Sequence, residues 1–337
     1  MELKKQSKNV PVSELRKDPV TGNWIVIAKG RAARPRGKAD GKADREDDIE
    51  TCPFEDPKAS GNADPVLLYP SQGEAGWSLQ VIPNKYPAFA GGGCPVITKV
   101  GPYAIQGGMG FHEVIITRDH VKHLALLARG KVEEVLRAYR TRYVALKGEE
   151  CVKYISLFHN HGKGAAASLS HPHSQLIAIP FLPSDIQRSL RGSNTFYKKH
   201  GECVHCAMLA WERRDNKRII FENEEFVAFC PFISRGAYEV RLLPKIHAAY
   251  FEKIDEGEIR ALSEILQEVL LRLYKNLENP PYNFYIHTAP VEQGEYPHYH
   301  WHFEIRPKLE TGAGFELGTG VEVSTVEPEE AAAILRS

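Results

Sequence analysis

Two histidines and a glutamine stand at alternate positions near the middle of the chain, in the order His171-Pro-His173-Ser-Gln175. In a β-strand, residues two apart point to the same side, so these three side chains would share one face. An imidazole is a good nucleophile towards phosphorus, and its phosphoramidate can pass the group onward. Gln175 can donate a hydrogen bond to a phosphoryl oxygen. The pattern predicts transfer of a phosphorus-centred group through His173, and the alternative is a pair of ordinary strand histidines.

A loop of small residues lies directly before these histidines, at Asn160-His-Gly-Lys-Gly-Ala-Ala-Ala-Ser168. Backbone N–H groups in such a loop can approach a phosphate closely. The His-Pro-His pattern after this loop favours the transfer interpretation over the structural one.

A pair of cysteines, Cys203-Val-His-Cys206, has the spacing at which two thiolates can converge on one tetrahedral ion. Zinc needs two more ligands, and His247 and His298 are predicted to supply them. Four protein ligands leave no open coordination position, so the predicted zinc site is structural. The alternative is two unligated structural cysteines.

A weaker form of this pattern occurs earlier, where Cys52-Pro-Phe-Glu55 has a carboxylate in place of the second thiolate. Carboxylate oxygen also binds zinc. The sequence therefore predicts another structural site from Cys52, Glu55, His120 and His171, with a decayed, metal-free site as the alternative. If His171 binds metal, His173 stays available for chemistry.

The elements that must position these residues occur twice along the chain. Each half contains a histidine, an amphipathic helix, a strand and a histidine cluster. These are His120, 131–147, 154–158 and His171 in the first half, and His247, 256–276, 283–287 and His298-Tyr-His300-Trp-His302 in the second. The step from the single histidine to the cluster is 51 residues in both halves. The matched order and equal step predict an internal duplication.

This order of elements predicts an α+β fold with two repeats, a mostly antiparallel sheet and flanking helices. The predicted domains are residues 1–190, which carry His173, and residues 191–337, which carry the C-x-x-C zinc site. Segment 181–199 is predicted to connect the halves, and the polar segment 35–48 to form a mobile loop. The second histidine cluster lacks a preceding glycine-rich loop, so it is predicted to shape the site or the fold.

The composition is that of an ordinary globular protein. Of 337 residues, 42% are hydrophobic and 26% are charged, and 43 basic side chains balance 43 acidic ones. Zero formal charge argues against a protein held by a nucleic-acid backbone or an acidic membrane. No apolar run is long enough to cross a bilayer and no signal-peptide pattern is present, so a cytoplasmic location is expected. In such a reducing environment, closely paired cysteines indicate metal sooner than a disulfide.

With these residues identified, nearly the whole chain resembles the galactose-1-phosphate uridylyltransferase family of the histidine-triad superfamily. The segments that carry the resemblance, besides His-Pro-His-x-Gln, are Asp18-Pro-Val-Thr-Gly-Asn-Trp24, Arg31-Ala-Ala-Arg34-Pro35, Cys52-Pro-Phe54, Asn84, Phe181-Leu-Pro183 and Gly314-Phe-Glu316. The resemblance implies that UDP-glucose gives UMP to His173 and that galactose 1-phosphate then accepts it. It also implies zinc, two histidine-triad-like repeats, and a homodimer acting on nucleotide sugars and sugar 1-phosphates.

The resemblance further implies roles for individual side chains. His171 would be a zinc ligand whose backbone helps to orient His173. Gln175 and Ser168 would contact the transferred phosphate, and Asn84 and Asn160 would line the nucleotide pocket. Arg31 and Arg34 would face further phosphates, and Glu316 would meet the sugar hydroxyls. Without the resemblance, the arginines would be interpreted as a solvated patch, the asparagines as turn residues and the glutamate as a surface carboxylate.

The sequence leaves the transferred group open. The C-x-x-C pair and Gly314-Phe-Glu-Leu-Gly-Thr-Gly320 are also similar to a plant relative that handles ADP-glucose, so AMP is the alternative to UMP. Two other classes of function also remain. A nucleotide hydrolase would pass the group from the histidine to water, and a zinc-dependent nucleotide-binding module would form no covalent adduct.

Overall fold

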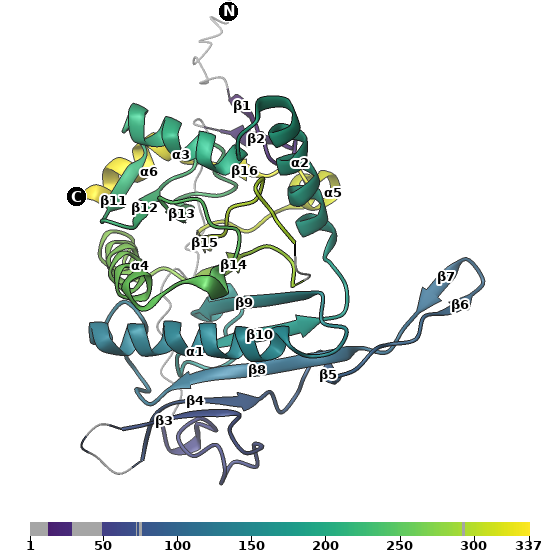
Figure 1. Ribbon diagram of the computed structural model, residues 1–337. Coiled ribbons are helices and arrows are strands. Elements are labelled where there is room, and N and C mark those ends of the chain that lie inside the picture. Colours follow the sequence, from purple (N-terminus) through teal and green to yellow (C-terminus); the bar gives the residue numbers. More distant parts are fainter. Residues whose placement is uncertain (1–12, 29–48, 72, 74–75, 292–293) are drawn as a thin grey trace, which may run out of the picture.

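The strands of both halves join in one sheet, with helices packed beside it (Figure 1). The computed structural model describes residues 13–28, 49–71, 73, 76–291 and 294–337. The helices of this part are α1 (Arg129–Lys147), α2 (Ser184–His200), α3 (Val204–Asp215), α4 (Glu256–Asn276), α5 (Gly314–Thr319) and α6 (Pro328–Arg336). The strands are β1 (Glu14–Lys17), β2 (Trp24–Ile27), β3 (Leu67–Pro70), β4 (Trp77–Pro83), β5 (Ala90–Gly91), β6 (Thr98–Val100), β7 (Tyr103–Ile105), β8 (Met109–Thr117), β9 (Tyr154–His161), β10 (His173–Ile179), β11 (Ile219–Glu222), β12 (Phe226–Phe229), β13 (Val240–Pro244), β14 (Tyr282–His287), β15 (His302–Pro307) and β16 (Val323–Ser324).

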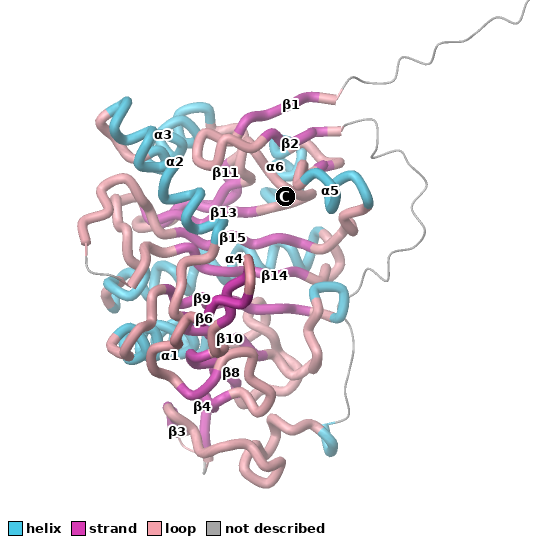
Figure 2. The backbone as a smooth tube through the Cα atoms, turned by 90° about the vertical axis from the view of Figure 1, so that its right-hand side faces the viewer, coloured by secondary structure: helices cyan, strands magenta, loops and turns pink. Residues whose placement is uncertain are grey.

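The main sheet has eleven strands within the described residues, in the order β11-β12-β13-β15-β14-β9-β10-β8-β4-β3, and β5 lies beside β8. Figure 2 shows these strands side by side from β11 to β3. All pairs along this order are antiparallel, and within this sheet β5 runs parallel to β8. The predicted α+β class and mostly antiparallel sheet are therefore confirmed. The halves meet at the β9–β14 pair, and the predicted division at 190 and 191 falls inside α2.

Helices α1 and α4 lie against each other and cover one face of the sheet (Figure 1). Apolar residues recur every three to four positions in each helix, so each buries one stripe. The stripes predicted from the sequence are buried: Val132, Val135, Leu136, Tyr139 and Tyr143 in α1, and Ile259, Leu262, Ile265, Leu266, Val269 and Leu273 in α4. Helix α4 has the bounds that the sequence predicted, and Asp255 and Glu258 form a capping box at its start.

The internal repeat is present, but its register differs from the one expected. His173 begins β10 and His302 begins β15, and the Nδ1 atom of each lies 2.9 Å from the backbone carbonyl two residues earlier. His300 is therefore the counterpart of His171. The step from His247 to His300 is 53 residues, so the equal step to His298 was coincidental. The cause is that loop 288–301, before β15, is longer than loop 162–172, before β10.

The remaining segments join the two ends of the chain to the body. The segment predicted to connect the halves forms α2, and β1, β2 and β16 make a separate three-stranded sheet from both chain ends. The predicted loop at 35–48 lies outside the described residues. No helix in the described ranges is both long enough and apolar enough to cross a bilayer.

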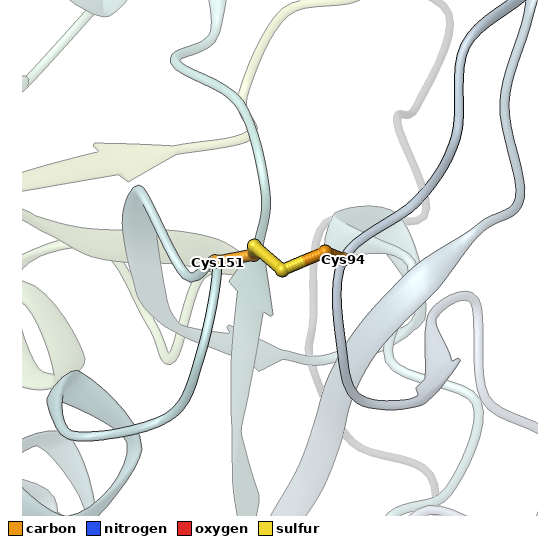
Figure 3. Close-up of a disulfide and its surroundings, with 2 residues drawn as sticks. All are labelled: Cys94 and Cys151. Carbon is orange, nitrogen blue, oxygen red and sulfur yellow. A yellow bond between two sulfur atoms is a disulfide. The ribbon is translucent and has the colours of Figure 1, made fainter.

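A disulfide joins Cys94 to Cys151, a bond that the sequence analysis did not predict (Figure 3). Cys94 precedes the β6–β7 hairpin, which projects away from the body in Figure 1. Cys151 lies in the turn between α1 and β9. The bond therefore ties the base of the projecting hairpin to the turn that leads into β9, the neighbour of the histidine-bearing β10.

Candidate active site

His173 and Gln175 lie on the face of the sheet opposite α1. Between them, Ser174 turns towards the helix, where its hydroxyl hydrogen-bonds to Tyr139 and lies 2.9 Å from His159 Nδ1. Because side chains alternate along a strand, the two flanking residues point to the other side. The shared face that the spacing predicted is therefore present in the fold.

The His173 ring is oriented through Nδ1, whose N–H donates to the backbone carbonyl of His171 over 2.9 Å. A neutral imidazole held in this way has its lone pair on Nε2, the atom that can attack phosphorus. The ring is 7% exposed and packs edge-on against Phe54. Burial lowers the pKa of His173, so the ring is neutral at pH 7 and its nucleophilic form predominates.

Asn160 lies on the same face, in the neighbouring strand β9. The amide nitrogen of Asn283 donates to Asn160 Oδ1 over 2.7 Å and to the carbonyl of Ala165 over 2.8 Å. Asn283 thus fastens the end of β9 to the small-residue loop that precedes β10. Ser168 is exposed in that loop.

Asn84 and Gln175 approach each other at the ring of His112, which belongs to β8. His112 Nε2 lies 2.8 Å from Gln175 Oε1 and 3.1 Å from Asn84 Nδ2. The structure therefore brings Asn84 to the same part of the sheet as Gln175, beside the strand that begins with His173.

The other predicted substrate residues are not placed beside His173. Arg31 and Arg34 lie outside the described residues. Glu316, in α5, lines a cavity of about 1230 Å³ together with His302 and Glu304, and His173 is not in the wall of this cavity. A single chain therefore does not bring Glu316 to the proposed nucleophile.

The four residues predicted for the first metal site converge, with donor atoms within 4.8 Å of one another: Cys52, Glu55, His120 and His171. Glu55 Oε1 lies 2.9 Å from His120 Nδ1 and 3.2 Å from His171 Nδ1. His171 Nε2–H donates to the carbonyl of Thr117 over 2.8 Å, so its Nδ1 lone pair faces the glutamate. A lone pair facing a carboxylate is stabilised by a cation between them, and this set of donors fits zinc.

Replacing Glu55 with alanine is expected to remove the zinc of this first site, because it deletes one of four ligands and leaves the two histidines without a common oxygen partner. Metal analysis of purified parent and variant measures this directly. Glu55→Asp is the control, since it keeps a carboxylate and should keep part of the metal. If the parent itself contains only the zinc of the second cluster, the metal-free alternative is favoured; two zinc ions per chain in both proteins would show that Glu55 is not needed as a ligand.

The second cluster consists of Cys203, Cys206, His247 and His300, again with donor atoms within 4.8 Å of one another. Cys206 Sγ lies 3.3 Å from His247 Nδ1 and 3.5 Å from His300 Nδ1. Hydrogen bonding to Cys206 lowers the pKa of the Cys203 thiol to about 5, as suits a thiolate that binds metal. This donor set also fits tetrahedral zinc.

The sequence assigned the fourth position of this cluster to His298, and the structure corrects it to His300. His298 contacts Cys203 through its backbone carbonyl, at 3.5 Å from the sulfur. The error follows from the longer loop before β15, which shifts the matching histidine by two positions.

The second half repeats the backbone of the site but not its chemistry. His302 occupies the position of His173, and Glu304 occupies that of Gln175. Glu304 accepts a hydrogen bond from the Tyr285 hydroxyl and lies 3.7 Å from Arg241. Burial raises the pKa of Glu304, but the nearby Arg235 and other groups hold it well below its usual value. An ionised carboxylate would repel a phosphoryl group where an amide would donate to it.

Three residues of these sites were missed in the sequence: His112, Asn283 and His300. Asn283 occurs in segment 283–287, which served only as a marker of the repeat, and no role was predicted for His112. Their side chains reach the site because of strand register, which links β8 to β10 and β9 to β14. Alternation along each strand was visible in the sequence, but which strands are neighbours was not.

Comparison with known proteins agrees with this geometry. Residues 3–183 match the family model described as galactose-1-phosphate uridyl transferase, N-terminal domain, and residues 103–336 match one described as a domain of unknown function. The chain is 32% identical to ADP-glucose phosphorylase of Arabidopsis thaliana, covering 96% of this chain and 92% of the relative. It is 30% identical to galactose-1-phosphate uridylyltransferase of Thermotoga maritima, covering 96% and 98%.

The fold is shared with a solved structure of the same group. The crystal structure of the Arabidopsis ADP-glucose phosphorylase with bound ADP-glucose has a TM-score of 0.82 with this chain at 30% identity. The match covers 97% of this chain and 99% of that chain. Sequence and fold thus agree over nearly the whole length. The chain belongs to the galactose-1-phosphate uridylyltransferase family and is a nucleotidyltransferase.

Proposed function

We propose that the enzyme transfers UMP from UDP-glucose to a hexose 1-phosphate, here galactose 1-phosphate, through a covalent bond to His173. The observation that carries this proposal is the hydrogen bond from His173 Nδ1 to the His171 carbonyl. It fixes the ring as a neutral base whose Nε2 lone pair is available. The name of the Thermotoga maritima relative supports the choice of substrates.

In the first step, His173 Nε2 attacks the α-phosphorus of UDP-glucose. An N–P bond forms, the bond from phosphorus to the bridging oxygen breaks, and glucose 1-phosphate leaves with that oxygen and its electron pair. The positive charge that develops on the ring is stabilised by the His171 carbonyl, which accepts from Nδ1–H. In the second step, a phosphate oxygen of galactose 1-phosphate attacks the same phosphorus, the N–P bond breaks, and UDP-galactose forms.

The remaining residues would bind and orient the substrates. Gln175 and Ser168 would donate to the transferred phosphoryl group, and Asn84 and Asn160 would line the nucleotide pocket. Such fixed donors lower the barrier mainly by positioning and by stabilising charge on the phosphoryl oxygens.

The phosphate and sugar contacts of Arg31, Arg34 and Glu316 complete the proposed site. A homodimer is part of the proposal. Its support is that Glu316 lines a cavity whose wall does not include His173. In the proposed dimer, Glu316 of the partner subunit would meet the sugar hydroxyls beside His173.

Zinc is proposed as a structural ion at both clusters. Cys52, Glu55, His120 and His171 would hold one ion, and Cys203, Cys206, His247 and His300 the other. Four protein ligands leave no position for substrate, so zinc would contribute by fixing the fold around β10 and β15. His171 links the first ion to chemistry, because its backbone carbonyl orients His173.

A second candidate is an ADP-glucose phosphorylase that uses the same histidine. The observation in its favour is the 32% identity with the Arabidopsis thaliana enzyme of that name. In this case AMP would be bound to His173, and inorganic phosphate would accept it to give ADP.

Product analysis with two donors and two acceptors tests these proposals. UDP-galactose from UDP-glucose and galactose 1-phosphate is the expected result. ADP from ADP-glucose and inorganic phosphate, with no reaction of UDP-glucose, would transfer the assignment to the second candidate. Free UMP or AMP released faster than any acceptor product would indicate a hydrolase, and no turnover of either donor would refute transfer.

A further inference from the structure

The imidazole of His112 contacts the side chain of Gln175 across two neighbouring strands. In the β8–β10 register, Gln175 lies opposite Val114 and His112 lies opposite Ile177. His112 and Gln175 are therefore diagonal neighbours on one face, a separation that long side chains can span. The contact is short, with 2.8 Å between His112 Nε2 and Gln175 Oε1.

The backbone fixes which nitrogen of His112 carries the proton. The N–H of Ala88 donates to His112 Nδ1 over 3.1 Å, so Nδ1 must be the acceptor. In a neutral imidazole the proton then resides on Nε2. Nε2–H donates to the carbonyl oxygen of Gln175, which accepts. The amide nitrogen of Asn84 lies 3.1 Å from the same Nε2, but it cannot donate there, because the backbone N–H of Ala88 already requires the lone pair to be on Nδ1.

This hydrogen bond also decides which way the Gln175 amide faces. A carboxamide presents an acceptor oxygen on one branch and a two-proton donor on the other. Because His112 occupies the oxygen, the NH₂ group is the branch left for a ligand. Among the described residues, Gln175 Nε2 makes no hydrogen bond to another side chain or to the backbone. The reversed amide would place its oxygen against the phosphoryl oxygens and repel them.

The equivalent position in the second half has different chemistry. Arg241 pairs with Glu304, as Val114 pairs with Gln175, so Glu239 stands where His112 stands. There Arg241 lies 3.3 Å from Glu239 and 3.7 Å from Glu304. The imidazole–amide pair therefore occurs in the half that carries His173 and is not a requirement of the repeated fold.

We propose that His112 is a positioning residue, which holds Gln175 so that its amide N–H groups face the phosphoryl group on His173. The inference rests on the proposed function, because it assigns a purpose to the Gln175 amide in that reaction. It predicts that His112 acts through Gln175 and has no separate effect on the reaction rate.

The test is a double-mutant cycle on the rate of His173 labelling. Parent, His112→Ala, His112→Gln, Gln175→Ala and the double variant are mixed with saturating UDP-glucose or ADP-glucose, quenched at intervals, and weighed intact. His112→Ala is expected to slow labelling by about 10- to 100-fold, the effect of misplacing a catalytic donor. In the Gln175→Ala background it should add less than about a twofold loss, because coupled residues are not additive.

Two further measurements separate positioning from a structural role. His112→Gln keeps an N–H donor near the place of Nε2, so it should recover most of the lost rate. The donor concentration that gives half the maximal labelling rate should stay within about twofold in His112→Ala. Melting temperatures of all variants show that they are folded.

Several outcomes would overturn the inference. These are an unchanged rate in His112→Ala, an equal loss with and without Gln175, or equal loss in His112→Gln and His112→Ala. Failure of the parent to be labelled by either donor would instead refute the proposed function, and the inference would fall with it. Labelling of the parent without dependence on His112 would leave the proposed function standing.

Discussion

His173→Gly is expected to abolish nucleotidyl transfer while the protein remains folded. The variant lacks the only atom proposed to bond to phosphorus, so acceleration through the covalent path is lost entirely. Removal of a nucleophile in other enzymes costs about 10⁴-fold or more in turnover. The measurement is steady-state formation of glucose 1-phosphate from the donor that the parent uses, together with a thermal melt.

The chain supplies a matched control for this variant. His302 begins the equivalent strand, and its ring has the same Nδ1 contact to a backbone carbonyl at 2.9 Å. His302→Gly therefore makes a comparable structural change without touching the proposed nucleophile, and it should retain transfer. Retained activity in His173→Gly, or loss in His302→Gly alone, would move the chemistry to the second half of the chain.

Cys203→Ser is expected to lower both zinc content and thermal stability. The thiolate is one of four ligands in the second cluster, and metal binding at such sites is coupled to folding, with about 10–16 kcal/mol per structural zinc. Losing about 3 kcal/mol of this would lower Tm by roughly 4 °C, because the entropy of unfolding of a chain of this size is about 0.7 kcal/mol/K. Metal analysis and calorimetry on the same sample measure both effects.

Cys230→Ala is the control for this substitution. Cys230 is also a buried free cysteine, but it is not part of either metal cluster in the described residues. The control should keep its zinc, although it loses some packing in the core. If Cys203→Ser keeps the zinc stoichiometry of the parent, the assignment of this cluster is wrong.

Local patterns predicted the parts of the site that depend on spacing within one segment. Alternation along β10 placed His173 and Gln175 on one face, and helical periodicity predicted the bounds of α4. The four residues of the first cluster also lie together, as predicted. They could be found in the sequence because thiolate, carboxylate and imidazole are the side-chain groups that bind zinc. In each case, the residues carry the information in their type and their short-range order.

Features that depend on how distant segments meet were not visible. The choice between His298 and His300 depended on the length of one loop, which equal spacing concealed. His112 reaches Gln175 through the register of β8 on β10. Glu316 lines a cavity whose wall does not include His173, and its position there depends on how the chain folds after β15. Register and loop path are set by packing over the whole sheet, which periodicity does not reveal.

The most direct test of the central claim is the mass of the protein after mixing with UDP-glucose and, separately, with ADP-glucose, followed by mapping of the modified peptide. We expect one added nucleoside monophosphate per chain, located on His173 and removed when sugar phosphate or inorganic phosphate is supplied. Turnover of a donor without any adduct, or an adduct on a residue other than His173, would contradict the central claim.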